Sequence, residues 1–497
     1  MKPNILYLHS HDAGRYIQPY GHAIPTPNLQ RLADDGVLFR NAFAAAPTCS
    51  PSRAALLTGQ SPHQAGMLGL AHLGWRLKDY EQHIIHRLHE IGYTSRLSGV
   101  QHIAGYQKAR PNERIGYDRV LPLARSAVRR GPRGQRVRKR RRIPRFRSIA
   151  RIPRVGRAAR QAGYQLRVTV RATHDVSAAK AAARWLRSAA ARNQPFFLSV
   201  GFIMPHRVYA NAQPRTHPAE DTRFVRPPAP LPDAPEVRRD MANYIASARL
   251  MDRHCGTVLN ALAVSGLTEN TLVIATTDHG LAFPRMKCRL TDHGLGVYLI
   301  MRGPGGFRGG HVIDGMVSHL DIYPTLCELL AIDPPDWLEG RSLMPLLRGE
   351  ATEIHDELFG EVTYHAAYEP LRSIRTQRWT YIRRFDPEWT RPVLPNCDNG
   401  PSKRYLIRHG WAERELPAEY LFDLVYDPNE AHNLADDPDH QQIKADLATR
   451  LKAWMARTDD PLVEGPVPLI EGGRMYPINA RSHHGVRPGR RKFVKAE

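Results

Sequence analysis

Short apolar runs of strand length alternate with longer helical patterns along the first half of the chain, and this alternation restricts the possible folds most strongly. Strands are predicted at residues 4–8, 37–39, 95–98, 196–202 and 271–276, and helices at residues 26–36, 51–57, 178–191 and 241–266. Such alternation is typical of a large, mostly parallel sheet with helices on both faces. Binding sites in these α/β folds form beyond the carboxyl ends of the strands.

The pattern of predicted strands and helices changes near residue 350. Short strand-like runs at residues 358–363 and 378–383, many turns, and a last helix at residues 440–456 follow. Because 497 residues exceed one ordinary domain, we predict a catalytic α/β domain at residues 1–345. A smaller α+β subdomain is predicted at residues 346–497.

The excess positive charge belongs to one segment. The chain has a net charge of +23, and residues 125–171 contain 18 Lys and Arg but no Asp or Glu. Without them the net charge falls to +5, so the segment does not predict a nucleic-acid-binding protein. Three interpretations stay open: a solvated surface insertion, a basic arm for a polyanion, and an aberrant stretch from a shifted reading frame.

The apolar runs predict a cytoplasmic protein, and the cysteines predict no disulfide framework. The longest apolar run, residues 196–205, is about half of what a membrane span requires. The apolar run at residues 5–8 is too short for a signal peptide, so we expect a cytoplasmic protein with no membrane partner. Five cysteines without a C-x-x-C pair do not predict a disulfide framework or a zinc cluster.

The most informative stretch is residues 49–59, C-S-P-S-R-A-A-L-L-T-G. Pro51 suits the first turn of a helix, so Cys49 is expected at the helix N-terminus. Backbone N–H groups at such an end favour an anion or a polarised nucleophile. Arg53 offers a fork of donors nearby. This pattern indicates an activated nucleophile, although a lone cysteine in such a place is more often only a packed side chain.

These residues resemble the sulfatase signature C-x-P-S-R-x-x-x-L-T-G and match every specified position. The resemblance extends from residues 3–5 (P-N-I) to residues 427–434 (D-P-N-E-A-H-N-L). It implies an alkaline-phosphatase-like fold and conversion of Cys49 to formylglycine by a separate maturation enzyme. The hydrated aldehyde is the nucleophile in that family.

The resemblance also implies a metal site at two strand ends. His11 and Asp12 follow the first strand, where sulfatases usually have two adjacent Asp, and Asp278 and His279 follow the strand at residues 271–276. With Cys49 these residues are the expected metal ligands. Carboxylates suit a hard divalent cation that polarises a sulfuryl oxygen. The family resemblance implies calcium, whereas the imidazoles favour manganese; magnesium stays possible.

Three more residues match the family pattern around the sulfate. His102 corresponds to the His of G-K-x-H, although Val100 stands where the family has Lys. His206 matches the family P-H pair and is the expected proton donor to the leaving group. Lys287, in K-C-R-L, resembles the Lys of K-x-T-L. Lys287, Arg53 and the metal would hold the developing charge, and His102 would help to deprotonate the second hydroxyl of the hydrate.

Within the family the chain is most similar to the heparan N-sulfatase (sulfamidase) branch. This similarity rests on residues 39–43 (F-R-N-A-F), 67–70 (M-L-G-L) and 361–363 (E-V-T), followed by L-R-S. Glu361 and Arg372 are therefore predicted to bind a charged sugar, and Lys287 and His206 the group that is cleaved.

The expected substrate is a sulfated small molecule or saccharide. A phosphonate monoester or phosphodiester hydrolase of the same superfamily is the alternative function. An inactive homologue that binds polyanions is a third possibility, and the oligomeric state stays open.

Overall fold

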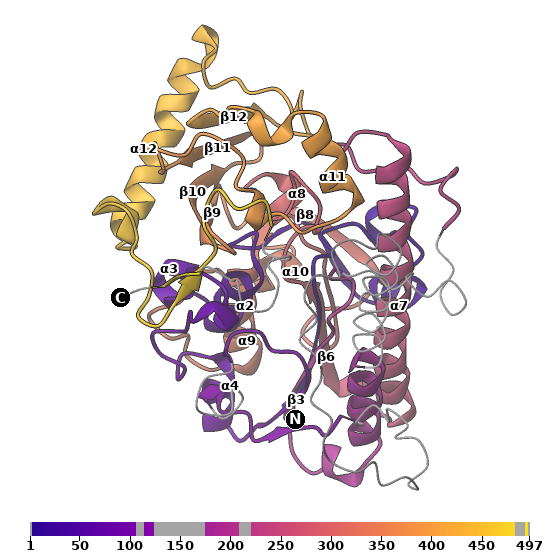
Figure 1. Ribbon diagram of the computed structural model, residues 1–497. Helices are drawn as coiled ribbons and strands as arrows, with labels where there is room; N and C mark the ends of the chain where they lie inside the picture. Colours follow the sequence, from indigo (N-terminus) through magenta and orange to yellow (C-terminus); the bar gives the residue numbers. More distant parts are fainter. Residues whose placement is uncertain (1, 106–113, 124–173, 208–219, 483–492, 496–497) are drawn as a thin grey trace, which may run out of the picture.

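The computed structural model describes residues 2–105, 114–123, 174–207, 220–482 and 493–495 (Figure 1). The Arg-rich segment at residues 125–171 lies outside the described residues, so its three interpretations stay open. The main sheet has eight strands in the order β4-β3-β5-β1-β6-β7-β2-β8. They are β1 (Asn4–Ser10), β2 (Val37–Phe43), β3 (Thr94–Gly99), β4 (Arg119–Val120), β5 (Phe196–Gly201), β6 (Thr271–Thr277), β7 (Leu299–Arg302) and β8 (His311–Ser318).

Only β7 runs against its neighbours, so the predicted mostly parallel sheet is confirmed. β1 lies in the centre and pairs with β5 on one side and β6 on the other. All seven of its residues are buried, as expected for a strand covered on both faces. The carboxyl ends of β1, β3, β5 and β6 therefore meet at one edge of the sheet.

Helices cover both faces of this sheet because successive side chains of each strand point to opposite sides. Ile5 and Tyr7 of β1 belong to one apolar cluster, and Leu6 and Leu8 belong to the other. The first cluster includes side chains of α2 (Cys49–Thr58), α4 (Ile84–Glu90), α9 (Ile322–Leu330) and α10 (Met344–Leu347). The second includes α1 (Pro27–Asp35), a helix at residues 174–186, and α7 (Pro235–Val264).

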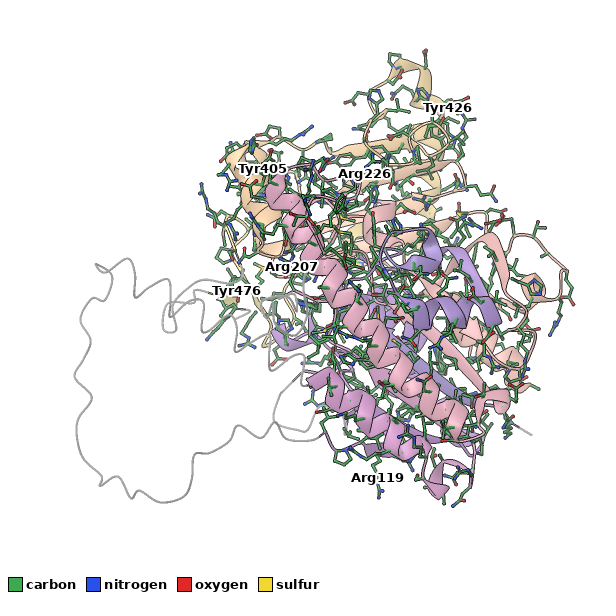
Figure 2. All side chains as sticks on the ribbon, turned by 90° about the vertical axis from the view of Figure 1, so that its right-hand side faces the viewer. Arg119, Arg207, Arg226, Tyr405, Tyr426 and Tyr476 are labelled. Atoms are coloured by element: carbon green, nitrogen blue, oxygen red, sulfur yellow. The ribbon has the colours of Figure 1, made fainter. Side chains whose placement is uncertain are left out.

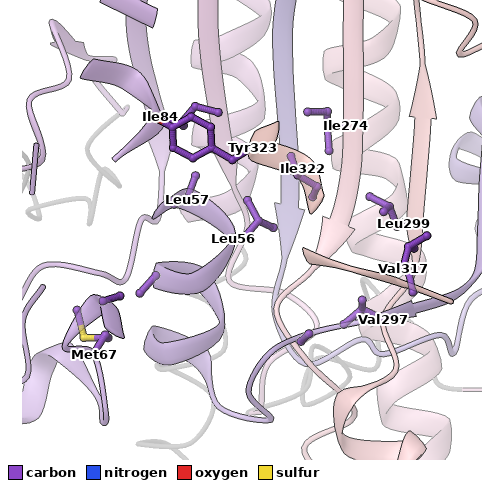
Figure 3. Packing of buried hydrophobic residues seen from close by; sticks show 14 of the residues in the cluster. Leu56, Leu57, Met67, Ile84, Ile274, Val297, Leu299, Val317, Ile322 and Tyr323 are labelled. Carbon is purple, nitrogen blue, oxygen red and sulfur yellow. The ribbon is translucent and has the colours of Figure 1, made fainter. Parts of the chain in front are cut away.

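The two faces can be followed in the close views. In Figure 3, Leu56 and Leu57 of α2 lie near Ile322 and Tyr323 of α9, beside strand residues of the first cluster. Figure 2 shows α7 along the other face, with Tyr405 of α11 (Pro401–Arg408) beside its amino end. Arg207 lies against α7 and donates from Nη1 to Asp240 Oδ1 at 2.8 Å.

The predicted C-terminal α+β module is also confirmed. Its antiparallel sheet has the order β12-β11-β10-β9 and packs with α12 (Gln441–Arg457) at one end of the main sheet (Figure 1). The strands are β9 (Leu358–Tyr364), β10 (Tyr368–Arg375), β11 (Trp379–Arg384) and β12 (Glu419–Asp423), and β13 (Arg474–Met475) pairs with β14 (Val494–Lys495). The predicted boundary at residue 345 falls within α10, between the two sheets.

Several strands differ from the sequence prediction: β4, β10, β12, β13 and β14 were not predicted, and the differences at β2, β7 and β8 have a clear physical reason. β2 extends four residues beyond the predicted end at residue 39, because Ala42 and Phe43 are buried beyond a polar interruption. β7 was missed because it has only four residues. β8 was missed because it is an edge strand whose first half is largely exposed, which weakens the apolar pattern. No helix within the described residues is long and apolar enough to cross a membrane.

Candidate active site

Strand ends bring the predicted metal ligands together. His11 and Asp12 follow β1, and Asp278 and His279 follow β6, its hydrogen-bonded neighbour. The backbone N–H of Asp12 donates to Asp278 Oδ1 at 2.8 Å, which joins the two loops directly. His11 Nδ1 lies 3.0 Å from Asp278 Oδ2. The structure therefore places all four side chains in one buried cluster, although they are 266 residues apart in sequence.

Cys49 is the first residue of α2, at the helix N-terminus that the sequence predicts. Its Sγ atom lies 3.2 Å from His279 Nε2, and the side chain is buried. Burial raises the pKa of the Cys49 thiol well above its usual range, which outweighs the nearby Lys287 cation. The thiol is therefore protonated at neutral pH and is a poor nucleophile as it stands.

The donor atoms of this cluster fit a divalent cation. Oxygen, nitrogen and sulfur atoms of His11, Asp12, Cys49 and Asp278 all lie within 4.8 Å of one another. Asp12 Oδ2 is buried and has no hydrogen-bond partner among the described residues, so it is available as a ligand. His279 Nδ1 lies 3.0 Å from the Gly280 carbonyl and must donate to it, which leaves the Nε2 lone pair facing the cluster.

Arg53 holds Asp278 in place from beneath the cluster. Its Nε and Nη2 atoms donate to Asp278 Oδ2 at 3.3 and 3.0 Å, and Nη2 also donates to the Ser10 carbonyl at 2.8 Å. Its Nη1 atom contacts His9. Burial alone would raise the pKa of Asp278, but His279, Arg53 and His11 hold it well below its usual range. Arg53 thus positions Asp278, and its part in holding the developing charge stays a prediction.

Lys287 reaches the cluster from the loop after β6. Its Nζ atom lies 3.2 Å from Asp12 Oδ1 and 3.1 Å from Asp398 Oδ2. Burial opposes the charged amine, but Asp12 and Asp398 raise the pKa of Lys287 well above its usual range. Lys287 is therefore a fixed cation beside the predicted metal ligands, and its contact with the sulfate stays a prediction. Asp398 comes from the C-terminal module.

The predicted histidines lie beside His11. The rings of His102 and His206 lie 5.3 and 5.4 Å from the ring of His11. His206 Nε2 lies 3.7 Å from Asp12 Oδ2, while its Nδ1 atom contacts the Arg207 carbonyl. The ring of His72 stacks on His102 at 5.8 Å, near the place where Val100 replaces the family lysine.

Glu361 and Arg372 do not join this cluster. Both are almost fully buried at the junction of the two sheets, where Arg372 donates from Nη2 to Asp460 Oδ1 at 2.9 Å. Glu361 Oε2 lies 3.2 Å from Arg372 Nη2 and 3.0 Å from His63 Nδ1. Because their charges are satisfied internally, the structure gives them a packing role instead of the predicted contact with a sugar. Arg372 also contacts both carboxylates of the His63, Glu361 and Asp460 group, so their charge is already neutralised without a metal ion.

Family comparisons agree with this geometry. The family model described as "Sulfatase" matches residues 3–332, which include the metal ligands, Cys49, His102, His206 and Lys287. The chain belongs to the sulfatase family. A second model, described as the C-terminal region of N-sulphoglucosamine sulphohydrolase, matches residues 283–391. This sulfatase is therefore a sulfuric ester hydrolase with an alkaline-phosphatase-like fold, related to the sulfamidase branch.

Similar proteins span nearly the whole chain. An ulvan-active sulfatase of Formosa agariphila is 28% identical over 99% of this chain and 88% of its own length. Human N-sulphoglucosamine sulphohydrolase is 28% identical over 94% of this chain and 93% of its own length. Among solved structures, a 2-O GAG sulfatase has a TM-score of 0.65 and 22% identity, covering 93% of this chain and 94% of the other. That last similarity concerns the fold alone.

Sequence reasoning missed three residues of the site. Asp398 lies 111 residues after Lys287 in an irregular segment, without a motif of its own. His72 and His9 act on predicted residues, His102 and Arg53, and not on the metal cluster directly. A search for polar residues at every strand end would have found His9, which lies within the last residues of β1.

Proposed function

We propose that this sulfatase hydrolyses sulfate esters or sulfamates on a saccharide, with a formylglycine at position 49 and one divalent cation. The observation that carries the proposal is the intact C-S-P-S-R motif, whose Cys49 lies beside His279 and within the Asp12 and Asp278 cluster. A protonated, buried thiol has little reactivity of its own. Conversion to the aldehyde would give this position a function that the thiol cannot supply.

The saccharide is supported by the relatives. N-Sulphoglucosamine sulphohydrolase and the ulvan-active sulfatase are both named for saccharide chemistry, and each aligns over most of this chain. The match of residues 283–391 to the C-terminal region of the sulfamidase supports a sulfamate in particular. A sulfated small molecule would fit the same cluster.

In this proposal, His11, Asp12, Asp278 and His279 hold the cation, which when bound would polarise a sulfuryl oxygen. A formylglycine hydrate supplies the hydroxyl that attacks sulfur. Lys287 Nζ opposes the negative charge that builds up on the sulfuryl oxygens. The position-49 side chain starts at a helix N-terminus, which also favours an anion.

Two histidines would move the protons. His206 Nδ1 contacts the Arg207 carbonyl and so carries a proton, which leaves Nε2 facing the cluster. In its charged form Nε2 can protonate the leaving oxygen or nitrogen. His102 Nδ1 is buried without a hydrogen-bond partner among the described residues and is the candidate base for the second hydroxyl.

The ligand types support a choice of cation. Two carboxylates suit calcium, which the family resemblance implies, or magnesium. The imidazoles of His11 and His279 replace oxygen ligands and favour manganese. We propose manganese as the more active ion. Restoring the chelated protein with each of the three ions and comparing kcat tests this choice.

A phosphonate monoester or phosphodiester hydrolase is the second candidate, favoured by the Asp278-His279 metal corner that such enzymes share. A solved phosphonate monoester hydrolase of Agrobacterium radiobacter has a TM-score of 0.61 and 21% identity, over 92% of this chain and 96% of its own. That similarity concerns the fold. Rates on matched aryl sulfate and aryl phosphonate esters separate the two candidates.

The test begins with peptide mass spectrometry across Cys49 on protein purified from its own host. We expect an aldehyde or its hydrate, and activity on sulfated or sulfamated saccharides that Cys49→Ala abolishes. An unmodified thiol would contradict the proposal, as would a kcat/KM on aryl phosphonates that exceeds that on every sulfated compound.

A further inference from the structure

A second pocket lies at the junction of the α/β domain and the C-terminal module. It has a volume of about 240 Å³ and opens between the loop after β6 and strand β12. Its floor is apolar, formed by Leu290, Leu371, Ile382 and Phe422, which belong to one buried cluster. None of the residues assigned above to the cation, the nucleophile or the proton transfers lines it.

Three guanidinium groups line this pocket. Arg289 is paired with Glu369 Oε1 at 3.1 Å. Arg285 donates to the Pro230 carbonyl at 3.1 Å, and neither Arg285 nor Arg414 has a carboxylate within 4.0 Å among the described residues. Arg285 is exposed at the surface, but partial desolvation by its neighbours, followed by the charges of Arg414 and Arg289, lowers its pKa. The three cations therefore repel one another, and an anion between them would relieve the repulsion.

The two carboxylates that line the pocket do not supply that anion. Glu415 is directed to Arg391, with Oε1 at 3.6 Å from Nε. Glu430 Oε1 lies 3.5 Å from Nη1 of Arg375, a residue that does not line the pocket. Burial also raises the pKa of Glu430 to about 7, so its charge is incomplete at neutral pH. The net charge of the lining is positive.

The uncharged residues of the lining can pack against the ring of a bound ligand. Trp411, in the short helix Trp411–Glu413, and Tyr420 of β12 supply aromatic surface beside the arginines. Thr291 lines the pocket, and its buried Oγ1 atom has no hydrogen-bond partner among the described residues. Guanidinium groups bind carboxylates and sulfates in a paired geometry, and apolar walls with a few polar groups are typical of small-molecule sites.

The loop after β6 serves both sites because its backbone turns sharply. Arg285 and Cys288 have φ values of 64° and 62°, in the left-handed region that side chains rarely adopt. Lys287, between them, reaches Asp12, while Arg285 and Arg289 line the second pocket. The pocket is thus adjacent to the metal cluster along the chain but has its own set of side chains.

We propose that this pocket binds an acidic sugar residue, a pyranose that carries a carboxylate or a sulfate, separately from the group that is hydrolysed. The arginines bind the anion, the aromatic rings cover a face of the sugar, and Thr291 Oγ1 accepts or donates a hydrogen bond. The choice of a sugar rests on the proposed function, whereas the anionic character rests on the pocket alone. The sugar is either a distal unit of the substrate chain or a free ligand.

Calorimetric titration of the full-length Cys49→Ala protein tests the proposal without turnover. The probes are glucuronate, glucose 6-sulfate, glucose and inorganic sulfate. We expect both charged sugars to bind about tenfold or more tightly than glucose or sulfate. Arg414→Ala should weaken them about tenfold or more, and Trp411→Ala should weaken glucuronate and glucose 6-sulfate alike. Arg414 is preferred to Arg289 because Arg289→Ala would leave the buried Glu369 unpaired.

Arg408→Ala is the matched control, because Arg408 is an exposed arginine of α11 that pairs with Glu236 at 2.9 Å. It should bind the charged sugars as the parent protein does. Equal binding by the parent and by both pocket variants would overturn the proposal, and so would tighter binding of inorganic sulfate than of either sugar. The titration tests binding alone, so its result does not depend on whether the matured enzyme hydrolyses a saccharide.

Kinetics on the matured enzyme distinguish the two sources of the sugar. If the pocket holds a distal unit of the substrate, Arg414→Ala raises KM for a sulfated oligosaccharide and leaves KM for an aryl sulfate unchanged. If it holds a free ligand, neither KM changes while the titration still shows the loss.

Discussion

Lys287 Nζ lies 3.1 Å from Asp398 Oδ2, and this ion pair joins the α/β domain to the C-terminal module within the active site. Both side chains are almost completely buried. Lys287 also contacts Asp12, a predicted metal ligand. Because Asp398 neutralises part of the lysine charge, it weakens the attraction between Lys287 and Asp12. The module therefore takes part in the electrostatics of the site as well as in packing.

Asp398→Asn should lower both stability and activity. Removing one partner of a buried ion pair costs about 3–5 kcal/mol, and the remaining pair with Asp12 places the cost at the lower end. Without Asp398, Lys287 would pair with Asp12 alone and would compete with the cation for that carboxylate. We therefore expect kcat/KM to fall about tenfold or more. Urea unfolding and steady-state kinetics measure the two effects. The exposed Asp436→Asn should change neither, and an unaltered Asp398→Asn protein would contradict the role of the pair.

Arg53→Lys should weaken binding of the cation. Arg53 donates twice to Asp278 and once to the Ser10 carbonyl, and the single ammonium of a lysine lacks the fixed fork of donors that makes these contacts together. Loss of a residue that orients a metal ligand typically costs about 10–100-fold in affinity. Calorimetric titration of the chelated protein with Mn²⁺ measures this change. Arg40→Lys, in an exposed pair with Asp314, is the control. Unchanged Mn²⁺ affinity with lost activity would instead indicate a contact with substrate.

His206→Ala should reduce activity in proportion to the basicity of the leaving group. General acid catalysis contributes about 10²–10⁴-fold, and a sugar hydroxyl needs it more than a nitrophenolate does. We therefore expect the larger loss of kcat on sulfated saccharides and a small loss on nitrophenyl sulfate. Equal losses on both substrates would exclude His206 as the proton donor. The exposed His432→Asn serves as the control for general effects on the protein.

The parts of the site that follow directly from local sequence could be predicted. Strand patterns ending in His11-Asp12 and Asp278-His279, and a proline that starts a helix beside Cys49, are local signals with a fixed geometric consequence in a parallel sheet. Lys287 and the histidines required the family pattern in addition. Five strands of the main sheet were predicted from their apolar runs, whereas β4, with two exposed residues, the short β7 and the half-exposed β8 were not.

Tertiary assembly determines the remaining features, which local patterns do not contain. Asp398 reaches Lys287 only because the C-terminal module packs on the sheet end, and no nearby residue signals this contact. Glu361 and Arg372 resembled sugar-binding residues because they are charged and lie in a matching stretch. In the fold they neutralise each other, together with Asp460 and His63, between the two sheets.

Glu361→Gln tests this packing role. The change removes the negative charge that faces both Arg372 and the His63 imidazole, whose pKa Glu361 raises against the effect of burial. We expect a loss of about 3–5 kcal/mol in the free energy of unfolding, with KM for any active substrate unchanged. Thermal and urea unfolding, with kinetics at a temperature where the variant is folded, give both quantities. A raised KM at unchanged stability would restore the predicted sugar contact.

His83 should make the protein less stable as the pH falls below 6.5. Its buried ring accepts a hydrogen bond from the Ile85 N–H at 3.1 Å and caps α4, and burial, with a smaller effect of His86 and His89, lowers its pKa from 6.5 to about 3. The folded protein keeps the ring neutral while the unfolded chain takes up a proton. The stabilisation is therefore complete above pH 6.5 and is lost at about 1.4 kcal/mol per pH unit as the pH falls towards 3.

His83→Asn isolates this effect, since asparagine can accept the same N–H at a helix start but does not titrate. Urea unfolding of both proteins between pH 7.5 and 5 gives the difference in their free energies of unfolding. The parent should lose about 2 kcal/mol relative to the variant over this range. Low pH also releases the cation and breaks other ion pairs, but these effects are the same in both proteins. They therefore cancel in the difference between the two free energies of unfolding. Parallel pH profiles would mean that His83 is already charged in the folded protein at pH 5.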